Sequence, residues 1–592
     1  MSGFDFAPRE LPSSFAALRP FDRALARWVL AYGGSPALAE LAALAAFAEA
    51  QGHACLQAGL SGMPAFDVGL LDSIADEAML GNGGAPTPVV RDPGGRLYLW
   101  RTFRHEQGAA KHLARRRAAA DPPPADALAA DLDVLFGAAA QQLDPPQRAA
   151  VAAAAGRRLL LLTGGPGTGK TTTVLRMLLL LARRAADAVP RIALAAPTGK
   201  AAQRLAESLR EGKARLAVDL PADWQGLLPQ VREDEATTVH RLLGWHPALD
   251  RWRHGPGDPL PHDVVVVDEA SMLDLAMLRA LLDAVRPDAT LVLVGDADQL
   301  GSVGAGSVLA DLVAAMADDD RGDLVRLSRV FRASAPLAGI TRAIGVGDGV
   351  ALRGAIDAAG PAASLQAVGT QAALRVALHD WADAIAADWP RTGPDPRDPD
   401  AAAQAAAAFS ALRRMQLLCA LREGPFGAEA ANRVLVERLR QRFGALGRGA
   451  SFGGRAVLVT HNDHARRIYN GDVGLELEAP DGRHWVWFPA RAGEGGAGAR
   501  AIAPAALPPH EPAFALTVHK SQGSEYDAVA VLLPPDAANP ILGRELLYTA
   551  ASRARESLSL WAMPAALETC LSRAPRRGGG LHARLAEARG AD

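Results

Sequence analysis

A glycine-rich stretch at residues 164–171 carries the residue types that bind phosphate. It reads GGPGTGKT and matches the pattern G-x-x-x-x-G-K-[ST]. Glycines let backbone N–H groups approach a phosphate without an obstructing Cβ atom. Lys170 would then reach the β- and γ-phosphates, and the Thr171 hydroxyl would bind Mg²⁺. The pattern predicts a nucleoside triphosphate site formed by Gly164, Gly165, Pro166, Gly167, Thr168, Gly169, Lys170, Thr171 and Thr172.

Two adjacent acids follow a second apolar stretch, DVVVVDEASMLD at residues 263–274. The four valines predict a buried strand that ends at Asp268 and Glu269. Asp268 fits the carboxylate on the Mg²⁺ side of a phosphate-loop protein, and Glu269 fits the base that activates the attacking water. Acids also gather at strand ends without a catalytic role, but the phosphate loop upstream favours hydrolysis.

Four further polar residues are placed to contact a bound nucleotide. Gln147 precedes the phosphate loop, and its amide could both donate to and accept from an adenine edge. Gln299 ends the apolar stretch TLVLVGDADQL, where it could sense the γ-phosphate. Arg332 and Arg553 follow strands beyond the first α/β unit, which makes them candidate arginine fingers that would close on the γ-phosphate from another domain.

The elements that must position these residues alternate between strand and helix. The apolar run before the phosphate loop predicts a buried strand, and the helix after it, from Thr172 to about Arg184, points the positive end of its dipole at the anion. From Ile192, a further strand ends at Pro197, at the edge of a parallel sheet where ligands bind. The fold class is therefore α/β.

Sequence composition divides the chain into three parts. Residues 1–120 predict a helical domain with a strand pair at 89–99 and no catalytic constellation, so packing or docking is its expected role. Residues 121–330 form the first α/β unit, with DPPP as a linker and a small insertion near 212–235. Residues 331–592 form the second unit, with a mobile segment at 391–410 and a small β-barrel near 471–510 whose residues 493–498 form a loose loop. A basic, glycine-rich tail follows Arg573.

The charge and cysteine content limit the class of protein. A net charge of −2 among 592 residues gives no global basic signature, so nucleic acid would need a local groove. Arg115–Arg117 could touch DNA, or could equally be a solvated helix end. Cys55, Cys419 and Cys570 form no C-x-x-C pair, which argues against a zinc or iron–sulfur site and suits a reducing cytoplasm. No signal peptide or membrane span is predicted.

The ordered motifs resemble those of superfamily 1 DNA helicases. These motifs are GGPGTGKT, APTGKAAQRL, TVHRLLG, VVVDEASM, GDADQL, LSRVFR, LTVHKSQGSEYD and YTAASRAR. Within that superfamily the chain is similar to the RecD family, the α subunits of RecBCD-type complexes (exodeoxyribonuclease V). GHACL at 52–56, ALREGPFG at 420–427 and YNGDVG at 469–474 add to this resemblance.

The resemblance implies two RecA-like motor domains, a helical N-terminal partner-docking domain and a small β-barrel insertion. It implies ATP and Mg²⁺ as cofactors and 5′-to-3′ movement along single-stranded DNA in double-strand break repair and homologous recombination. RecB-like and RecC-like subunits would be the partners, in a bacterial, nucleoid-associated setting. The DNA-binding residues would be Pro197, Thr198, Lys200, His240, Thr460, Asn462, Thr517, His519 and Lys520.

Two other functions stay open. The chain could be a stand-alone RecD-like helicase, although we find no helix–hairpin–helix repeats before residue 120. It could also be a structural subunit that binds ATP without translocating, against which Lys170, Glu269, Arg332 and Arg553 argue. Ser552 stands where the resemblance leads us to expect threonine. Because serine also carries a hydroxyl, we expect little effect. No nuclease site is evident, so DNA cutting would belong to another subunit.

Overall fold

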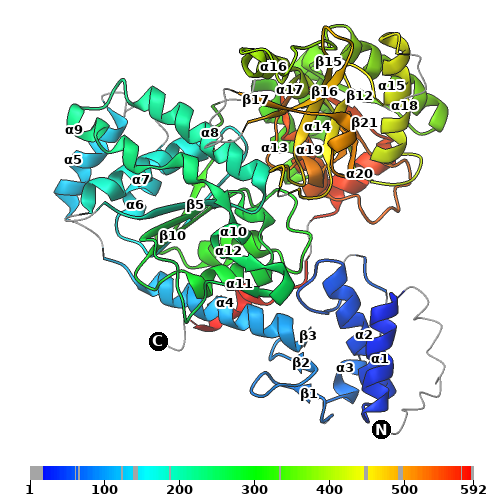
Figure 1. Cartoon of the computed structure of the whole chain (residues 1–592). Coiled ribbons are helices and arrows are strands. Elements are labelled where there is room, and N and C mark those ends of the chain that lie inside the picture. The colour runs from blue at the N-terminus through cyan, green and yellow to red at the C-terminus, as the bar shows by residue number, and fades with distance from the viewer. Residues whose placement is uncertain are drawn as a thin grey trace.

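The computed structural model separates the chain into three lobes (Figure 1). It describes residues 18–60, 62–64, 67, 69–75, 77–121, 124–137, 145–185, 189–331, 335–445, 451–463, 465–490, 498–574 and 577–588. The N-terminal helices form one lobe, and each of the other two contains a parallel sheet. None of the helices in these ranges is long and apolar enough to cross a membrane.

The N-terminal lobe pairs two helices over a small sheet. Its elements are α1 (Pro20–Ala31), α2 (Pro36–Ala50), α3 (Leu70–Ser73), β1 (Leu80–Gly81), β2 (Val89–Arg91) and β3 (Leu97–Leu99). Ser35 caps α2 by accepting a hydrogen bond from the Leu38 amide at 3.1 Å. The predicted strand pair is β2 and β3, which run antiparallel.

Helix α4 (Trp100–Ala118) leads from this lobe to the first sheet. Its last turn contains Arg115–Arg117, which we predicted to touch DNA or to be a solvated helix end. Arg116 is buried and donates to the carbonyl oxygens of Val285 at 2.6 Å and Ala289 at 2.9 Å. Arg117 is buried as well and forms an ion pair with Asp323 at 2.6 Å. Neither residue is a solvated helix end or free to meet DNA, because this face of α4 packs on the sheet; only Arg115 is exposed.

The first sheet has six parallel strands in the order β11-β4-β10-β9-β5-β6. These are β4 (Leu159–Gly164), β5 (Ile192–Ala196), β6 (Thr237–Thr238), β9 (Val264–Val267), β10 (Thr290–Gly295) and β11 (Leu324–Leu327). Alternating side chains of β4 enter two separate cores, so the sheet is covered on both faces. One core includes α5 (Ala125–Phe136), α6 (Pro145–Ala154), α7 (Lys170–Arg184) and α8 (Gly199–Leu216); the other includes α4, α11 (Leu275–Ala284) and α12 (Val308–Asp318).

Smaller elements lie beside this sheet: α9 (Ala222–Gln225), α10 (Val239–Leu242) and the hairpin of β7 (Trp245–His246) and β8 (Arg251–Trp252). The irregular insertion expected from residue 212 begins later, because α8 continues to Leu216.

The second sheet is also parallel, in the order β12-β21-β20-β13-β19. Its strands are β12 (Ala363–Gln366), β13 (Met415–Cys419), β19 (Ala515–Thr517), β20 (Tyr526–Leu532) and β21 (Ala554–Trp561). The helices of this lobe are α13 (Ala335–Val346), α14 (Gly349–Ala359), α15 (Gln371–Ala386), α17 (Ala411–Arg414), α18 (Ala428–Arg442), α19 (Arg544–Ala551) and α20 (Pro564–Ser572).

The segment predicted to be a mobile loop at 391–410 contains a helix, α16 (Ala401–Ala408). This prediction was wrong because an alanine run has the highest helix propensity of any sequence, and Ala401 and Ala405 are buried. The helix packs beside β17 (Ala499–Ile502). The low complexity of the segment therefore reflects a small-residue packing face.

An antiparallel sheet extends beyond the predicted insertion at 471–510. It contains β14 (Ala456–Val459), β15 (Val473–Glu478), β16 (His484–Pro489), β17 and β18 (His510–Pro512), in the order β17-β16-β15-β14-β18. Within the described strands this order is open, and a closed barrel stays a prediction. The loop predicted at 493–498 lies outside the described residues except for Gly498.

The chain finally returns from the second sheet to the first. Helix α21 (Leu581–Glu587) packs against α4 and α12, and Leu581 and Leu585 join the core beneath the first sheet. Figure 1 shows this C-terminal segment beside α4, away from the second lobe. The basic, glycine-rich tail thus connects parts of the chain that are far apart in sequence.

Asp311 of α12 faces this junction and makes stability depend on pH. Burial and the carboxylate of Glu106 raise its pKa to about 7, although Arg577 opposes the shift. An unfolded aspartate titrates near pH 4, so the folded state retains a proton that the unfolded state loses between about pH 4 and 7. Stability from this group therefore falls as pH rises through that window.

We expect Asp311→Asn to remove this loss, because asparagine stays neutral. The variant should exceed the thermal midpoint of the native protein by about 1–3 °C more at pH 8 than at pH 5, where most of the loss has not yet occurred. Calorimetry at both pH values measures the difference. An equal shift at pH 5 and pH 8 would show that Asp311 does not titrate as described.

Candidate active site

The phosphate loop joins β4 to α7 in the predicted strand–loop–helix order. Gly167 and Gly169 adopt φ values of 73° and 83°, in the left-handed region that glycine tolerates best. Lys170 is the first residue of α7, and its Nζ donates to the carbonyl oxygens of Gly164 at 2.6 Å and Gly165 at 3.0 Å. The ammonium group is therefore folded over the loop, at the N-terminus of a helix whose dipole favours an anion.

The two predicted acids follow β9. Asp268 accepts a hydrogen bond from the Glu269 amide at 2.9 Å. Burial and the Glu269 carboxylate raise the pKa of Asp268 to about 6, while Lys170 opposes the shift. Glu269 has a φ of 52°, a strained conformation for a residue with a side chain. Backbone strain of this kind is common where a side chain must be aimed at a reaction.

Gln299 and Arg553 meet across the two parallel sheets. Both side chains are buried, and the Arg553 guanidinium donates to Gln299 Oε1. Gln299 Nε2 donates to Asp296 at 3.0 Å, and the hydroxyl of Tyr548 donates to the same carboxylate at 3.1 Å. These contacts bring a loop of the first lobe and helix α19 of the second lobe to one point beside the phosphate loop.

Gln147 and Phe331 flank the other side of the loop. Gln147 is buried and donates from Nε2 to the Thr168 carbonyl at 3.0 Å. The Phe331 amide donates to the Gly167 carbonyl at 2.8 Å, and its side chain is 45% exposed. Sequence reasoning missed Phe331, although an aromatic residue inside the motif LSRVFR was a usable signal. Arg332, the next residue, lies outside the described residues.

One cavity brings most of the predicted site residues together, but Gln147, Gly164 and Gly165 do not line it. It is lined by Pro166, Gly167, Thr168, Gly169, Lys170, Thr171, Thr172, Asp268, Glu269, Gln299 and Arg553, and also by Ala201, Arg204, Leu205, Ser208 and Glu525. Sequence reasoning did not find Arg204 and Glu525. They form an ion pair between the lobes, and Arg555 pairs with the same carboxylate at 2.8 Å. Burial would raise the pKa of Glu525, but the two arginines outweigh it and hold the pKa at about 2.

The residues expected to face DNA on the first lobe lie at the ends of strands. Pro197 and Thr198 follow β5, and the Thr198 hydroxyl caps α8 by accepting from the Ala201 amide at 3.2 Å. Lys200 lines a groove between the first and second lobes. His240 of α10 lies beside the rings of Trp245 and Trp252, with centroids 6.5 and 5.4 Å away, and burial lowers its pKa.

On the second lobe the corresponding residues have local partners. Thr460 donates to the Pro509 carbonyl at 2.9 Å, and Asn462 Oδ1 accepts from the Asn470 amide at 2.8 Å. Thr517 accepts from the Lys520 amide at 3.4 Å. Burial lowers the pKa of His519, and the positive charge of Arg577 lowers it further.

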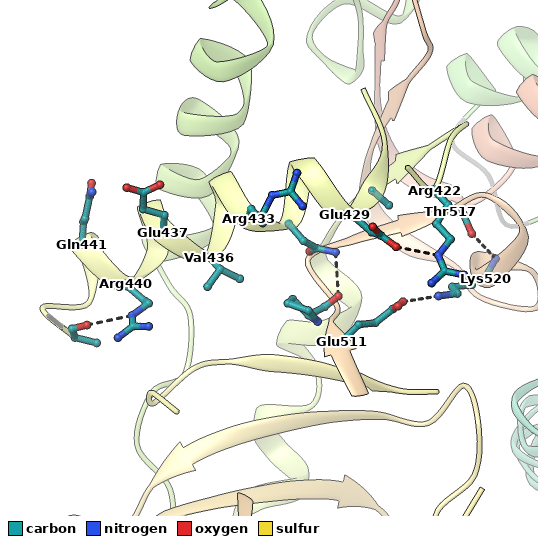
Figure 2. A pocket seen from close by; sticks show the side chains of 14 residues that line it. Arg422, Glu429, Arg433, Val436, Glu437, Arg440, Gln441, Glu511, Thr517 and Lys520 are labelled. Carbon is teal, nitrogen blue, oxygen red and sulfur yellow. Dashed lines mark hydrogen bonds and ion pairs between the residues drawn. The ribbon is translucent and has the colours of Figure 1, made fainter. Parts of the chain in front are cut away.

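Thr517 and Lys520 also line a pocket of about 630 Å³ along helix α18 (Figure 2). Lys520 forms an ion pair with Glu511, and Arg422 pairs with Glu429 at 3.0 Å. The remaining cationic lining residues are Arg433 and Arg440. The pocket places several cations and a hydroxyl beside a strand end, but Glu429, Glu437 and Glu511 line it as well and would repel a phosphate backbone.

Comparisons with known proteins find family models and relatives that match parts of this chain. A family model described as an AAA domain matches residues 147–305, and one described as a UvrD-like helicase C-terminal domain matches residues 512–561. The RecBCD enzyme subunit RecD of Mycobacterium tuberculosis (strain CDC 1551 / Oshkosh) is 38% identical over 406 residues, covering 67% of this chain and 64% of the relative. That of Mycolicibacterium smegmatis is 39% identical over 412 residues, covering 67% of this chain and 66% of the relative.

More distant matches include the ATP-dependent RecD2 DNA helicase of Deinococcus radiodurans, 32% identical over 387 residues, covering 63% of this chain and 44% of the relative. Among solved structures, Bacteroides Pif1 bound to single-stranded DNA is 16% identical with a TM-score of 0.34, covering 73% of this chain and 93% of that one. The chain spans a little under two thirds of the length of the RecD relatives it matches, 64% for the first.

The contact between Arg553 and Gln299 predicts a specific defect. Arg553→Ala should leave the affinity for a fluorescent ATP analogue within about threefold, because Lys170 and the phosphate loop are unchanged. It should lower the turnover of ATP by about 10³-fold or more, the range measured for arginine fingers. Equilibrium titration and steady-state hydrolysis measure the two effects.

Arg544→Ala is the matched control. Arg544 is the first residue of α19, the helix that ends just before Arg553, and donates to the Leu571 backbone carbonyl at 2.7 and 3.0 Å, but does not line the cavity. If Arg544→Ala lost as much turnover as Arg553→Ala, the defect would come from loss of α19 packing.

Proposed function

We propose that this chain is the ATP-driven 5′-to-3′ DNA helicase subunit of a RecBCD-type complex, because it belongs to the RecD family of superfamily 1 helicases. One observation carries this proposal. The cavity over the phosphate loop is lined by Lys170, Asp268 and Gln299 from the first lobe and by Glu525 and Arg553 from the second. A nucleotide bound there would touch both lobes, so its hydrolysis would change their separation.

The residues of the first lobe fit a magnesium nucleotide. Thr171 supplies a hydroxyl and Asp268 a carboxylate, the hard oxygen ligands that Mg²⁺ prefers. A bound Mg²⁺ would neutralise charge on the phosphates. Lys170 would exchange its two carbonyl contacts for phosphate oxygens, and Glu269 would orient and deprotonate the attacking water. Gln147 would contact the adenine edge.

The second lobe would supply the positive charge that stabilises the transition state of ATP hydrolysis. Arg553 is held by the Thr549 carbonyl at 3.1 Å and by Gln299, so its guanidinium is already aimed at the cavity. Arg332 would be the second finger, as its position in the motif LSRVFR suggests. Fixed donors of this kind stabilise developing charge without reorganising during the reaction.

Single-stranded DNA would cross the strand ends of both sheets. Pro197, Thr198, Lys200 and His240 would meet it on the first lobe, and Thr460, Asn462, Thr517, His519 and Lys520 on the second. Because Lys520 is paired with Glu511, a phosphate would have to displace that carboxylate to reach the ammonium group. The 5′-to-3′ polarity is proposed from the family alone.

The proposed domain assignment follows the three lobes, except that α4 and α21 pack in the core of the first sheet although their residue numbers fall in the other two ranges. We assign residues 1–120 to partner docking, 121–330 to a first RecA-like domain and 331–592 to a second, with the antiparallel sheet as its insertion. The parallel order of each main sheet supports this division. DNA cutting would reside in another subunit, and the assembled protein would act on duplex ends in the bacterial cytoplasm.

An aromatic stripe on α1 supports docking by the N-terminal lobe. Phe21, Trp28 and Tyr32 are 62%, 38% and 64% exposed, and the rings of Trp28 and Tyr32 lie 5.0 Å apart. Exposed aromatic clusters are typical of protein interfaces. We assign this stripe, residues 21, 28 and 32, to the contact with a partner subunit of the complex.

The helicase assignment is tested in a complex whose other motor has been inactivated. The native chain should then unwind a duplex with a 5′ overhang, and Lys170→Gln should abolish unwinding and DNA-stimulated ATP hydrolysis while the complex still assembles. Strand-displacement assays with 5′ and 3′ overhangs measure polarity. Unwinding that persists with Lys170→Gln would show that this chain is not the 5′-to-3′ helicase.

The two alternatives give different outcomes in the same assays. A stand-alone helicase would elute as an active monomer without partners. A structural subunit would assemble and bind ATP, yet would show no DNA-stimulated hydrolysis even in its native form.

The docking stripe is tested by Trp28→Ser combined with Tyr32→Ser. Removing two interface aromatics typically costs binding about 2 kcal/mol or more, which is roughly thirtyfold in affinity. We expect co-purification with the partner subunits to fail while ATP binding stays unchanged. Val350→Ser, at an exposed position on α14, is the control. Undiminished assembly of the double variant would place the docking surface elsewhere.

A further inference from the structure

The loop at residues 301–306, which follows Gln299, is held by a residue from the far end of the chain. Arg577 Nη1 lies 2.6 Å from the Ser302 carbonyl oxygen, 3.3 Å from that of Gly304 and 3.4 Å from that of Gly306. Guanidinium groups bind carbonyl oxygens strongly when water is excluded, and Arg577 is partly buried. One side chain therefore fixes the path of the loop.

The loop has little room to move away from Arg577. The Gly306 amide donates to the Gly52 carbonyl at 3.0 Å, and the Leu275 amide donates to the Ala305 carbonyl at 3.1 Å. A Cβ atom on Gly304 would lie only 2.4 Å from the Asp274 carboxylate. The loop is thus packed between α11, the N-terminal lobe and Arg577.

The other end of the loop enters the second lobe. The Leu300 amide donates to the Thr549 hydroxyl at 2.6 Å, and Gln522 Nε2 donates to the Leu300 carbonyl at 2.7 Å. The Leu300 side chain belongs to the core of the second lobe. The Gly301 amide also hydrogen-bonds Glu545 of α19, and Arg577 attracts the same carboxylate. A displacement of α19 would therefore reach Arg577 through this loop.

Residues 577–584, here called the C-terminal strap, are themselves firmly anchored. The Gly578 amide donates to His53 Nδ1 at 3.0 Å, and the Ala54 amide donates to the Gly578 carbonyl at 2.6 Å. Arg584 pairs with Glu106 at 2.8 Å, and its guanidinium lies 4.4 Å from the centre of the Phe103 ring. The strap therefore joins the GHACL stretch at 52–56 to α4, and gives both of these sequence features a structural role.

We propose that Arg577 is a positioning residue for ATP hydrolysis. By holding the loop at 301–306, it keeps Gln299 aligned with Arg553 and links that contact to the N-terminal lobe. The idea rests on the proposed function, since it assigns a role in the same site. Arg577 itself does not line the nucleotide cavity, so it acts only through the loop.

The first test compares Arg577→Ala with Arg577→Lys in the full chain assembled with its partner subunits. Arg577→Ala should lower kcat for DNA-stimulated ATP hydrolysis about tenfold or more, with KM for ATP changed less than about twofold, because the phosphate loop is untouched. Arg577→Lys should recover part of kcat, since an ammonium group can still donate to the loop carbonyls.

Arg573→Ala is the matched control. Arg573 lies just before the strap and donates to the carbonyl oxygens of Asn539 at 2.7 Å and Leu542 at 3.4 Å, both in the second lobe. It should leave kcat within about twofold. An unchanged kcat in Arg577→Ala, or an equal loss in Arg573→Ala, would overturn the positioning role.

A second measurement does not depend on catalysis. Hydrogen exchange should accelerate in Arg577→Ala at peptides containing residues 300–306 and 52–56, and stay unchanged at the phosphate loop. This result would support the positioning contact even if the native chain proved not to hydrolyse ATP. Unaltered exchange at 300–306 would show that Arg577 does not hold the loop.

Discussion

The hydrogen bond from Arg553 to Gln299 is one of several buried contacts that join the lobes of the two parallel sheets. It is buried, and both partners carry further polar contacts, to Thr549 and to Asp296. A buried guanidinium that lost its acceptor would carry a large desolvation cost, so the two lobes are coupled whenever the cleft is closed. A phosphate that entered the cavity would compete for the same donors. Under the proposed function, this contact would couple nucleotide binding to the separation of the two lobes.

Charged groups near this contact are stabilised by partners on the opposite lobe. Glu525 of the second lobe keeps its low pKa through Arg204 of the first lobe together with Arg555. Asp268 carries the opposite shift, because burial and Glu269 favour its neutral form until a cation arrives. Under the proposed function, such a site would bind a cation and a polyanion together more readily than either alone. The free energy of binding the cation and the polyanion would then drive movement of the lobes.

The sequence predicted those parts of the fold and site that depend on local pattern. The phosphate loop with Lys170, the acids after β9 and the strand before Gln299 are each specified within a dozen neighbouring residues. Contacts between distant residues could not be predicted in this way. The pairing of Arg204 with Glu525, the burial of Arg116 and the anchoring of Arg577 all depend on which faces meet after folding. The alanine run at 401–408 misled for a related reason, since low complexity describes composition and not packing.

The proposed mechanism requires that nucleotide binding changes the separation of the two parallel sheets. Cys55, Cys419 and Cys570 are buried, so dyes can be directed to cysteines placed at the exposed Val218 of the first lobe and Val376 of the second. Energy transfer between these dyes, measured with single-stranded DNA present, should change when a non-hydrolysable ATP analogue saturates the site and should return on its removal. A constant transfer efficiency at saturating analogue would contradict the claim.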